Sequence, residues 1–248
     1  MDNSEIKAIE DLSLNAWPSH QMQLYDGWIL RFSHFYTHRT NCVEQFGNSV
    51  IPYEEKVPYC EEIYKRWNSP CIFKITPLSK KSLDEMLEKR GYVIEHTTSV
   101  MCCDLKNVPE FEAHKEVELS ERIPDEWIDA LFTIKGDATV IHLKIVPQMY
   151  AAIPKDVLCV CIKDERNIVA TGLGILDRDY IGIYAINVDK KYRRRGFARA
   201  ICETLLTEGK KRGAKKAYLQ VVSDNAPAIA LYESLGFGKE YEYWFRAK

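Results

Sequence analysis

Hydrophobic and polar positions follow two different periods along the chain, and these periods predict strands and helices in turn. Short segments with alternating or continuous β-branched and aromatic residues predict strands, and longer segments with apolar residues every three or four positions predict helices. The expected strands are 27–32, 40–47, 71–76, 93–105, three antiparallel strands within 156–188, 216–222 and 240–247. The expected helices are 52–67, 79–90 with a capping serine, 123–134, a weaker one near 141–152, one that follows Gly196, and 223–237.

The helix that follows Gly196 has the clearest two-sided pattern. Basic residues at 210–212 suit the negative end of the helix dipole, and Gly213 can take the left-handed conformation that often ends a helix. We therefore expect an amphipathic helix that buries one face. The apolar positions of that face are Ala198, Ile201, Cys202, Leu205 and Leu206.

The segment 87–101 repeats the layout of the segment 232–246. In both, a helix end, a glycine, an aromatic residue, a polar turn and a long strand follow in the same order, and Gly91 and Gly236 are 145 positions apart. A polar segment at 106–116 contains a proline and shows no period, which is typical of a linker. We therefore expect two related α/β units, residues 1–105 and residues 117–248.

Composition and charge restrict the classes of function. The chain has 248 residues, 46% hydrophobic residues and a formal net charge of −2, which is the ordinary range for a globular protein. The balanced charge argues against nucleic acid as a partner. The N-terminal segment is acidic and lacks the apolar region of a signal peptide, and no apolar run approaches the roughly 18 residues that a membrane span needs. We expect a cytoplasmic protein without a membrane partner.

The eight cysteines and six histidines offer no spacing that is typical of a metal site. No C-x-x-C pair is present, and Cys159 and Cys161 share one face of an apolar strand. Such cysteines usually act as small hydrophobic side chains. We therefore expect no metal site, and we expect a reducing compartment.

The segment 193–198 carries the strongest functional signal. Arg193, Arg194 and Arg195 run into Gly196 at the point where a strand gives way to a helix. The start of a helix presents about four unpaired N–H groups and roughly half a positive charge, and this combination suits a phosphate group. Glycine admits a ligand close to the backbone. The loop therefore predicts a pyrophosphate site, although neither a Walker loop nor G-x-G-x-x-G is present.

Residues 117–248 resemble the GNAT acyltransferases. Their diphosphate loop, [Q/R]-x-x-G-x-[G/A], is matched by 193–198, the preceding strand ends in IYAINV, and Asn225 and Tyr232 stand where that family carries an asparagine and a tyrosine. On GWILRF, RTNCV and LEKRGY, the first half resembles the partial, cofactor-loop-free repeat of tandem members. The resemblance implies an α/β (α+β) fold of two GNAT-like units. In this fold helices flank a mixed, mostly antiparallel sheet, and the central strand of the C-terminal unit is splayed.

The resemblance also implies a reaction and a set of site residues. The protein would transfer acetyl from acetyl-CoA to a primary amine of a small molecule or peptide. Tyr232 would protonate the departing thiolate, and a tyrosine with a pKa near 10 is a fair acid towards a thiolate whose thiol has a pKa of about 8.5. Main-chain groups of Ile186 and Val188 and the side chain of Asn225 would hold the pantetheine arm. The diphosphate site would comprise Arg193, Arg194, Arg195, Gly196, Phe197, Ala198 and Arg199.

One position departs from the pattern of the family. Some members carry a glutamate as general base six residues before the position of Val188, and Gly182 stands there in this chain. Tyr184, Asp177, Asp179 or a chain of water molecules are the alternatives, and the spacing does not choose between them. Without that glutamate, a non-catalytic protein that binds or senses acyl-CoA is the alternative function.

Other readings of single residues stay open at this point. The arginines of 193–195 could be a solvated charge run, Asn225 only a helix cap and Tyr232 only a core aromatic residue. The sequence specifies neither the acceptor amine nor the oligomeric state. Four residues of the first half are expected either to line a substrate cleft between the halves or to pack the domains: Trp28, Arg31, Arg39 and Asn41.

Overall fold

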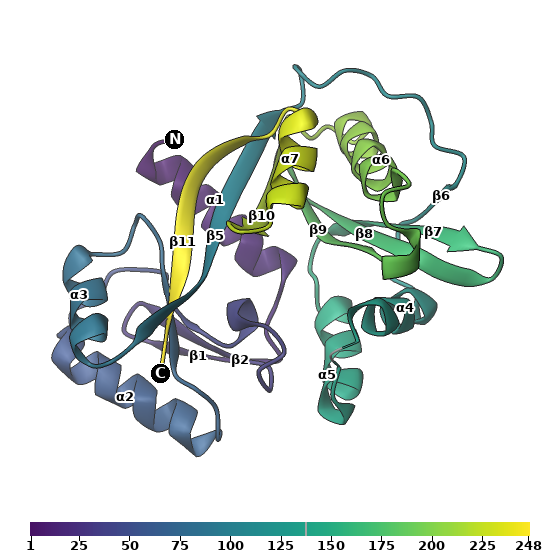
Figure 1. Ribbon diagram of the computed structural model, residues 1–248. Coiled ribbons are helices and arrows are strands. Elements are labelled where there is room, and N and C mark those ends of the chain that lie inside the picture. The colour runs from purple at the N-terminus through teal and green to yellow at the C-terminus, as the bar shows by residue number, and fades with distance from the viewer. Residues whose placement is uncertain (137) are drawn as a thin grey trace.

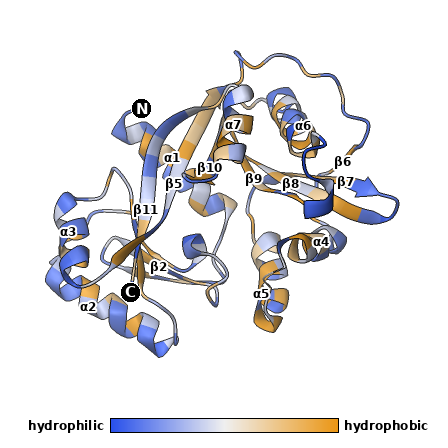
Figure 2. Cartoon of the chain, viewed as in Figure 1, coloured by the Kyte–Doolittle hydropathy of each residue, from blue (hydrophilic) through white to orange (hydrophobic). Residues whose placement is uncertain are grey.

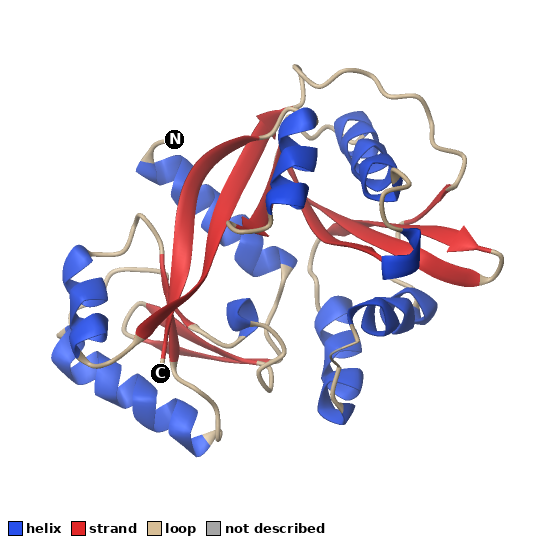
Figure 3. Cartoon of the chain, viewed as in Figure 1, coloured by secondary structure: helices blue, strands red, loops and turns tan. Residues whose placement is uncertain are grey.

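A single mixed sheet of eleven strands runs through the molecule, with helices on both of its faces (Figures 1 and 3). This computed structural model describes residues 1–136 and 138–248. The strand order is β1-β2-β3-β4-β11-β5-β10-β9-β8-β7-β6. Only the pairs β3–β4 and β9–β10 are parallel among the described strands. The expected α/β fold with a mostly antiparallel sheet is therefore confirmed.

The bounds of the elements agree closely with most of the predicted segments. The strands are β1 Gln21–Tyr25, β2 Trp28–Phe32, β3 Val43–Gln45, β4 Ile72–Ile75, β5 Val93–Asp104, β6 Val117–Ser120, β7 Asp156–Asp164, β8 Asn167–Asp177, β9 Tyr180–Val188, β10 Lys216–Val222 and β11 Gly238–Ala247. The helices are α1 Asn3–Ala16, α2 Tyr53–Arg66, α3 Lys81–Lys89, α4 Asp125–Lys135, α5 Val140–Ala151, α6 Phe197–Lys211 and α7 Ala226–Ser234. Two 3₁₀ turns, His38–Thr40 and Lys190–Tyr192, complete the set.

Three elements lie outside the predicted segments, and one predicted cap is wrong. The elements α1, β1 and β6 were not expected. Lys80, not a serine, is the N-cap of α3, and no side chain caps this helix. The hydroxyl of Ser79 instead accepts a hydrogen bond from the Thr76 amide at 3.1 Å and so closes the turn before the helix. None of the described helices is both long and apolar enough to cross a bilayer.

The last strands of the two halves exchange partners. β5, from the first half, lies between β11 and β10, and β11, from the second half, lies between β4 and β5. The ladder between β5 and β10 runs from Asp104 opposite Lys216 to Thr98 opposite Val222. The first half has the expected strand–helix–strand order in β4, α3 and β5, and α7 lies 145 positions after α3 at both ends. We keep 1–105 and 117–248 as proposed units that share one sheet.

The helices form separate hydrophobic cores on the faces of the sheet (Figure 2). α6 packs Ile201 and Leu205 on one face of β7, β8 and β9, while α4 and α5 pack on the opposite face around Trp127. Cys159 and Cys161 both point into the core under α4 and α5, as expected. α2 and α3 cover β2, β3 and β4 of the first half.

A buried group of charged residues lies where α1, β2, β3, β4 and β11 meet. Lys74 donates a hydrogen bond to Glu10 and lies 3.4 Å from Glu44, which Arg31 approaches to 3.0 Å. The Tyr241 hydroxyl donates to Glu10 at 2.6 Å. Burial alone would raise the pKa of Glu44, but the positive charges of Lys74 and then Arg31 outweigh it and lower this pKa. Burial alone would lower the pKa of Lys74, but the carboxylates of Glu10 and then Glu44 outweigh it and raise this pKa, so that both signs of charge persist in the interior.

Replacement of Lys74 by Met should destabilise the fold strongly, because it leaves two buried carboxylates with less compensation. Removal of one partner of a buried pair costs about 3–5 kcal/mol, so the urea midpoint should fall sharply. Lys81→Met is the matched control, because Lys81 and Glu85 form an exposed pair that is worth about 0.5 kcal/mol or less. Equal midpoints for the two variants would contradict this account.

The destabilisation by Lys74→Met should also depend on pH. Glu44 has a lowered pKa in the folded protein, so its share of the stability is present above its unfolded pKa of about 4.3 and is lost as the pH falls through the folded value. The difference in unfolding free energy between wild type and variant should therefore shrink in acid. Urea titrations at neutral pH and at low pH measure it.

Candidate functional site

The site begins where β9 and β10 part. The two strands pair from Tyr180 opposite Lys216 to Ile183 opposite Leu219, and the pairing then stops. On its other side β9 has a bulge against β8, where Ala185 takes a left-handed φ of 50° and its carbonyl accepts a hydrogen bond from the Thr171 hydroxyl. Beyond the branch point, the edge of β9 that faces β10 is left with backbone groups available for an added chain.

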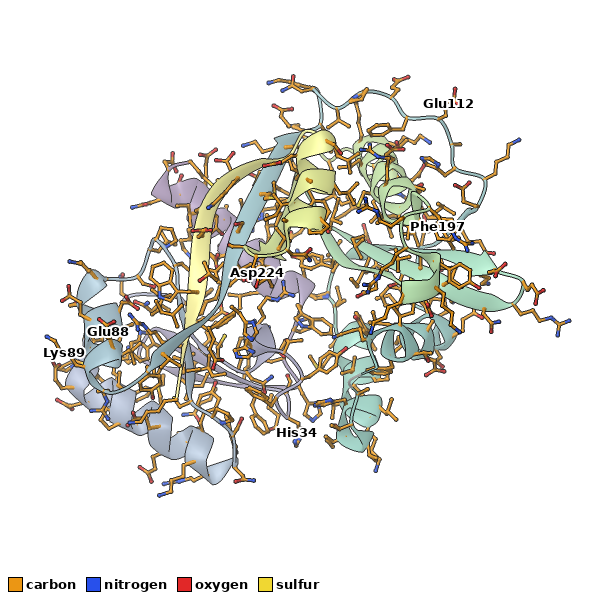
Figure 4. All side chains as sticks on the ribbon, in the orientation of Figure 1. His34, Glu88, Lys89, Glu112, Phe197 and Asp224 are labelled. Carbon is orange, nitrogen blue, oxygen red and sulfur yellow. The ribbon has the colours of Figure 1, made fainter. Side chains whose placement is uncertain are left out.

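A cleft of about 970 Å³ fills the space between the parted strands. Residues 184–188 and 219–222 line it, and the turns that carry Phe197 and Asp224, labelled in Figure 4, lie at the starts of α6 and α7. Of the eleven residues that the sequence proposed for the site, Arg195 alone is not on its walls. The other ten line the cleft: Ile186, Val188, Arg193, Arg194, Gly196, Phe197, Ala198, Arg199, Asn225 and Tyr232.

The arginine–glycine loop turns the chain sharply into α6. Arg194 has a φ of 65° and Gly196 a φ of 85°, so both adopt the left-handed conformation. Gly196 is the N-cap of α6, which has no side-chain cap, and its carbonyl accepts the first helical hydrogen bond from Ala200. The amides of Phe197, Ala198 and Arg199 therefore have no partner within the helix. A Cβ at Gly196 would meet no atom within 4 Å, so its backbone angle is the reason for glycine at this position.

The arginine side chains of the loop have different partners. Arg193 donates to the Val188 carbonyl at 3.2 Å, and the Arg195 guanidinium lies over the Tyr192 ring at 5.0 Å. Arg199 pairs with Glu203 at 3.1 Å. Arg194 makes no ion pair with any described residue. Arg195 therefore braces the loop, while Arg194 has its guanidinium free for a ligand.

Asn225 and Tyr232 lie two turns apart on α7. The Asn225 side-chain oxygen caps the helix by accepting from the Ala228 amide at 3.3 Å, and within the described chain its Nδ2 makes no hydrogen bond. The cap and a ligand contact are therefore compatible. Tyr232 is 8% exposed, its ring contacts Phe237 at 6.1 Å, and its hydroxyl bonds to no described residue. Burial raises the pKa of Tyr232, so that the hydroxyl is protonated at neutral pH.

Two tyrosines fill the position next to Gly182. A Cβ on Gly182 would lie 2.6 Å from the Tyr184 ring and 2.7 Å from the Tyr218 ring. The two hydroxyls are hydrogen-bonded to each other, and burial raises the pKa of both. A longer side chain at residue 182 therefore has no room.

Of the protein groups considered as general base, only Tyr184 lines the cleft. Asp177 is buried beside Lys155 at 2.9 Å and accepts from Asn15 at 2.9 Å. Burial would raise the pKa of Asp177, but its hydrogen bonds with Lys155 and Asn15 outweigh this effect and lower the pKa. Neither Asp177 nor Asp179 is among the residues of the wall.

The first half of the chain supplies part of the wall. Arg39 lines the cleft, together with Trp17, Tyr36 and Thr37, and no motif in the sequence marks these last three as site residues. The loop that carries Tyr36, Thr37 and Arg39 also carries His34 (Figure 4), whose carbonyl lies 3.0 Å from Nε2 of His142 on α5. The other three expected residues pack the first half instead. Trp28 contacts Phe73, Arg31 pairs with Glu44, and Asn41 accepts from the amides of Ser33 and Phe35.

Comparison with known proteins gives the chain a family. The family model described as "Probable histone acetyltransferase Rv0428c C-terminal" matches residues 3–245. An uncharacterized N-acetyltransferase of Bacillus subtilis, YobR, is 24% identical over 98% of this chain and 99% of its own. The [ribosomal protein bS18]-alanine N-acetyltransferase of Escherichia coli is 48% identical over 61 residues, which are 25% of this chain and 41% of that enzyme.

A solved structure shares the fold over nearly the whole length. The GCN5-related N-acetyltransferase from Kribbella flavida aligns with a TM-score of 0.69 at 15% identity, and the alignment covers 99% of this chain and 95% of that one. At this identity the likeness shows the fold alone.

Gly182→Ala should lower the stability, because its methyl group overlaps two packed rings. Overpacking of this kind typically costs about 1–3 kcal/mol, which a thermal melt resolves. Gly238→Ala is the matched control in a strand, since a Cβ there meets no atom within 4 Å. If the two variants melt together, the tyrosine pair does not exclude a side chain at residue 182.

Proposed function

Because the chain belongs to this family of GNAT N-acetyltransferases, we propose that it transfers acetyl from acetyl-CoA to a primary amine. The observation that carries the proposal is the unpaired edge of β9, which runs along the cleft to the uncapped start of α6. An extended amide-containing arm can pair with such an edge, and a diphosphate suits the helix start at its end. Acetyl-CoA has both parts in this order.

The residues of the cleft fit coenzyme A with its pantetheine arm along β9 and its diphosphate at the start of α6. Main-chain groups of Ile186 and Val188 pair with the pantetheine arm, and the Asn225 Nδ2 donates to it. The amides of 194–199 and the free guanidinium of Arg194 hold the diphosphate, while Arg195 keeps the loop in shape. The corresponding helix of the first half, α2, begins at Tyr53 after the N-cap Pro52, and the two glutamates of its first turn repel an anion. One coenzyme A therefore binds per chain.

The reaction is a direct transfer. The neutral amine attacks the thioester carbonyl, a C–N bond forms, and the C–S bond breaks as the tetrahedral intermediate collapses. The thiolate takes a proton from the Tyr232 hydroxyl, the amine nitrogen releases its proton to water, directly or through the Tyr184 hydroxyl, and water returns a proton to the Tyr232 oxygen. The Tyr232 hydroxyl has no hydrogen-bond partner among the described residues and is protonated at neutral pH, so it can donate when negative charge appears on sulfur, although the rise of its pKa through burial makes it a weaker acid.

The alternative is an acyl-CoA-binding or sensing protein without turnover. The filled position at Gly182 favours it, because no carboxylate can act as base there. Tyr232 favours the enzyme, because a pure binder gains nothing from an acid next to the sulfur.

We also propose a cytoplasmic location. All eight cysteines are free thiols, and seven of them are buried. Thiols that stay reduced are typical of a reducing compartment.

Arg195→Glu combined with Gly196→Asp should abolish binding of acetyl-CoA, because Gly196→Asp puts negative charge where the diphosphate lies and Arg195→Glu removes the guanidinium that braces the loop against Tyr192. Isothermal titration calorimetry should give one site per chain for the wild type and no measurable heat for the variant. The control pair Arg66→Glu with Gly47→Asp makes the same charge change in the first half and should bind normally. Two equivalent sites in the wild type would overturn the assignment.

Tyr232→Phe should lower kcat by about 10²- to 10⁴-fold with little change in affinity for acetyl-CoA. The ring and its packing against Phe237 remain, and only the hydroxyl is lost. Tyr53→Phe removes a hydroxyl far along the first half and should keep full turnover. Full turnover of Tyr232→Phe would favour the binding protein over the enzyme.

A further inference from the structure

All charged side chains on the described walls of the cleft have the same sign. No aspartate or glutamate lines it among residues 1–136 and 138–248, although the chain as a whole carries a net charge of −2. The positive field is therefore a local property of the cleft. The cationic residues of the wall are Arg39, Lys135, Lys190, Arg193, Arg194 and Arg199.

These cations lie at different ends of the cleft. Four of them belong to the segment 190–199, where the proposed diphosphate lies. Arg39 comes from the other half of the chain and lies beside Gln220 on β10, close to the point where β9 and β10 part. That point is the end of the cleft opposite the diphosphate loop, where the acceptor amine has to meet the thioester.

Arg39 is held in place without a carboxylate. It donates to the Gln220 side-chain oxygen at 3.1 Å, and the Tyr243 hydroxyl donates to the same oxygen at 2.9 Å. Arginine can only donate, so the oxygen of Gln220 has to face it. The buried Nε2 of Gln220 is then a second donor beside Arg39, and it has no partner among the described residues.

The buried arginines Arg31 and Arg246, unlike Arg39, each pair with a carboxylate. Arg31 pairs with Glu44 at 3.0 Å, and Arg246 pairs with Asp84 at 2.7 Å. Arg39 is half-buried and forms no ion pair within the described chain. A planar guanidinium that is fixed on one side and unpaired on the other is suited to a carboxylate, which it can bind through two hydrogen bonds.

We propose that Arg39 binds a carboxylate of the acceptor, so that the substrate is a primary amine that carries an acidic group. The inference rests on the acetyl transfer proposed above and names its substrate class.

An aromatic wall of Trp17, Tyr36 and Tyr150 packs the apolar part of such an acceptor. The ring centroid of Trp17 lies 4.8 Å from that of Tyr150 and 6.1 Å from that of Tyr36. Polyamines, aminoglycosides and lysine-rich tails bring further positive charge into a cleft that has no described carboxylate to receive it.

The same cleft favours an α-amine over a lysine side chain. No carboxylate on its described walls can take the proton of an ammonium ion, and nearby cations favour the neutral amine. An α-amine of a peptide has a pKa of about 8 and a lysine amine about 10.4, so roughly 300-fold more of the α-amine is neutral at pH 7. The acceptor is therefore an α-amine with a carboxylate close by, and an acidic peptide fits better than a free amino acid, whose own carboxylate raises the pKa of its amine.

Matched pairs of acceptors test the inference on the wild-type protein. The dipeptide amides Ala-Glu and Ala-Gln differ in one charge, and free alanine and alaninamide separate an amino acid from a peptide as the source of the carboxylate. We expect kcat/KM to be at least 10-fold higher for an acidic member than for its neutral partner, and higher than for spermidine or the ε-amine of Nα-acetyl-lysine. A preference for neutral or cationic amines would overturn the proposal.

Variants of Arg39 test the residue itself. Arg39→Gln should reduce the acid-to-neutral ratio of kcat/KM to near one, and Arg39→Glu should reverse it, through KM more than kcat. Arg166→Gln, on the exposed turn between β7 and β8, is the control and should keep the wild-type ratio. Calorimetry with acetyl-CoA separates the two levels of the argument: no binding refutes the proposed function, whereas normal binding with an unchanged ratio in Arg39→Gln refutes the carboxylate site alone.

Discussion

The antiparallel ladder between β5 and β10 is the interaction on which the cleft depends. β10 stays hydrogen-bonded to β5 as far as Val222 but leaves β9 after Leu219. It therefore follows β5, a strand of the first half, and diverges from β9, a strand of its own half. The space that opens is the cleft, and the unpaired edge of β9 is its wall. The first half of the chain, which has no arginine–glycine loop, thus shapes the cleft that the loop of the second half borders.

The buried charges around Lys74 connect the exchanged strand β11 to β4 and α1. Lys74 on β4 contacts Glu10 on α1 and lies 4.5 Å from the ring of Tyr243 on β11, so one ammonium group joins elements from both halves. Tyr243 in turn donates to Gln220, which holds Arg39. A continuous series of polar contacts therefore runs from the interior of the first half to the far end of the cleft.

Local features of the site could be predicted from the sequence, and contacts between distant segments could not. The loop at 193–198 and the helix with Asn225 and Tyr232 are each readable because their residues are neighbours in the chain. α1 also has a readable signal, a capping box at Asp2 and Glu5 with apolar positions at helical spacing. Arg39 and Gln220 are 181 positions apart, and the strand exchange that joins them depends on pairing energies that no local pattern records.

The exchange of β5 and β11 also has a consequence for synthesis on the ribosome. β4 receives its second neighbour only when β11 has been made, and until then this edge of β4 has no partner. Contacts between such distant segments slow folding, and exposed strand edges are sites of aggregation. A nascent chain of this protein therefore passes most of its translation with an incomplete sheet, whose open strand edges favour aggregation until the last strand is made.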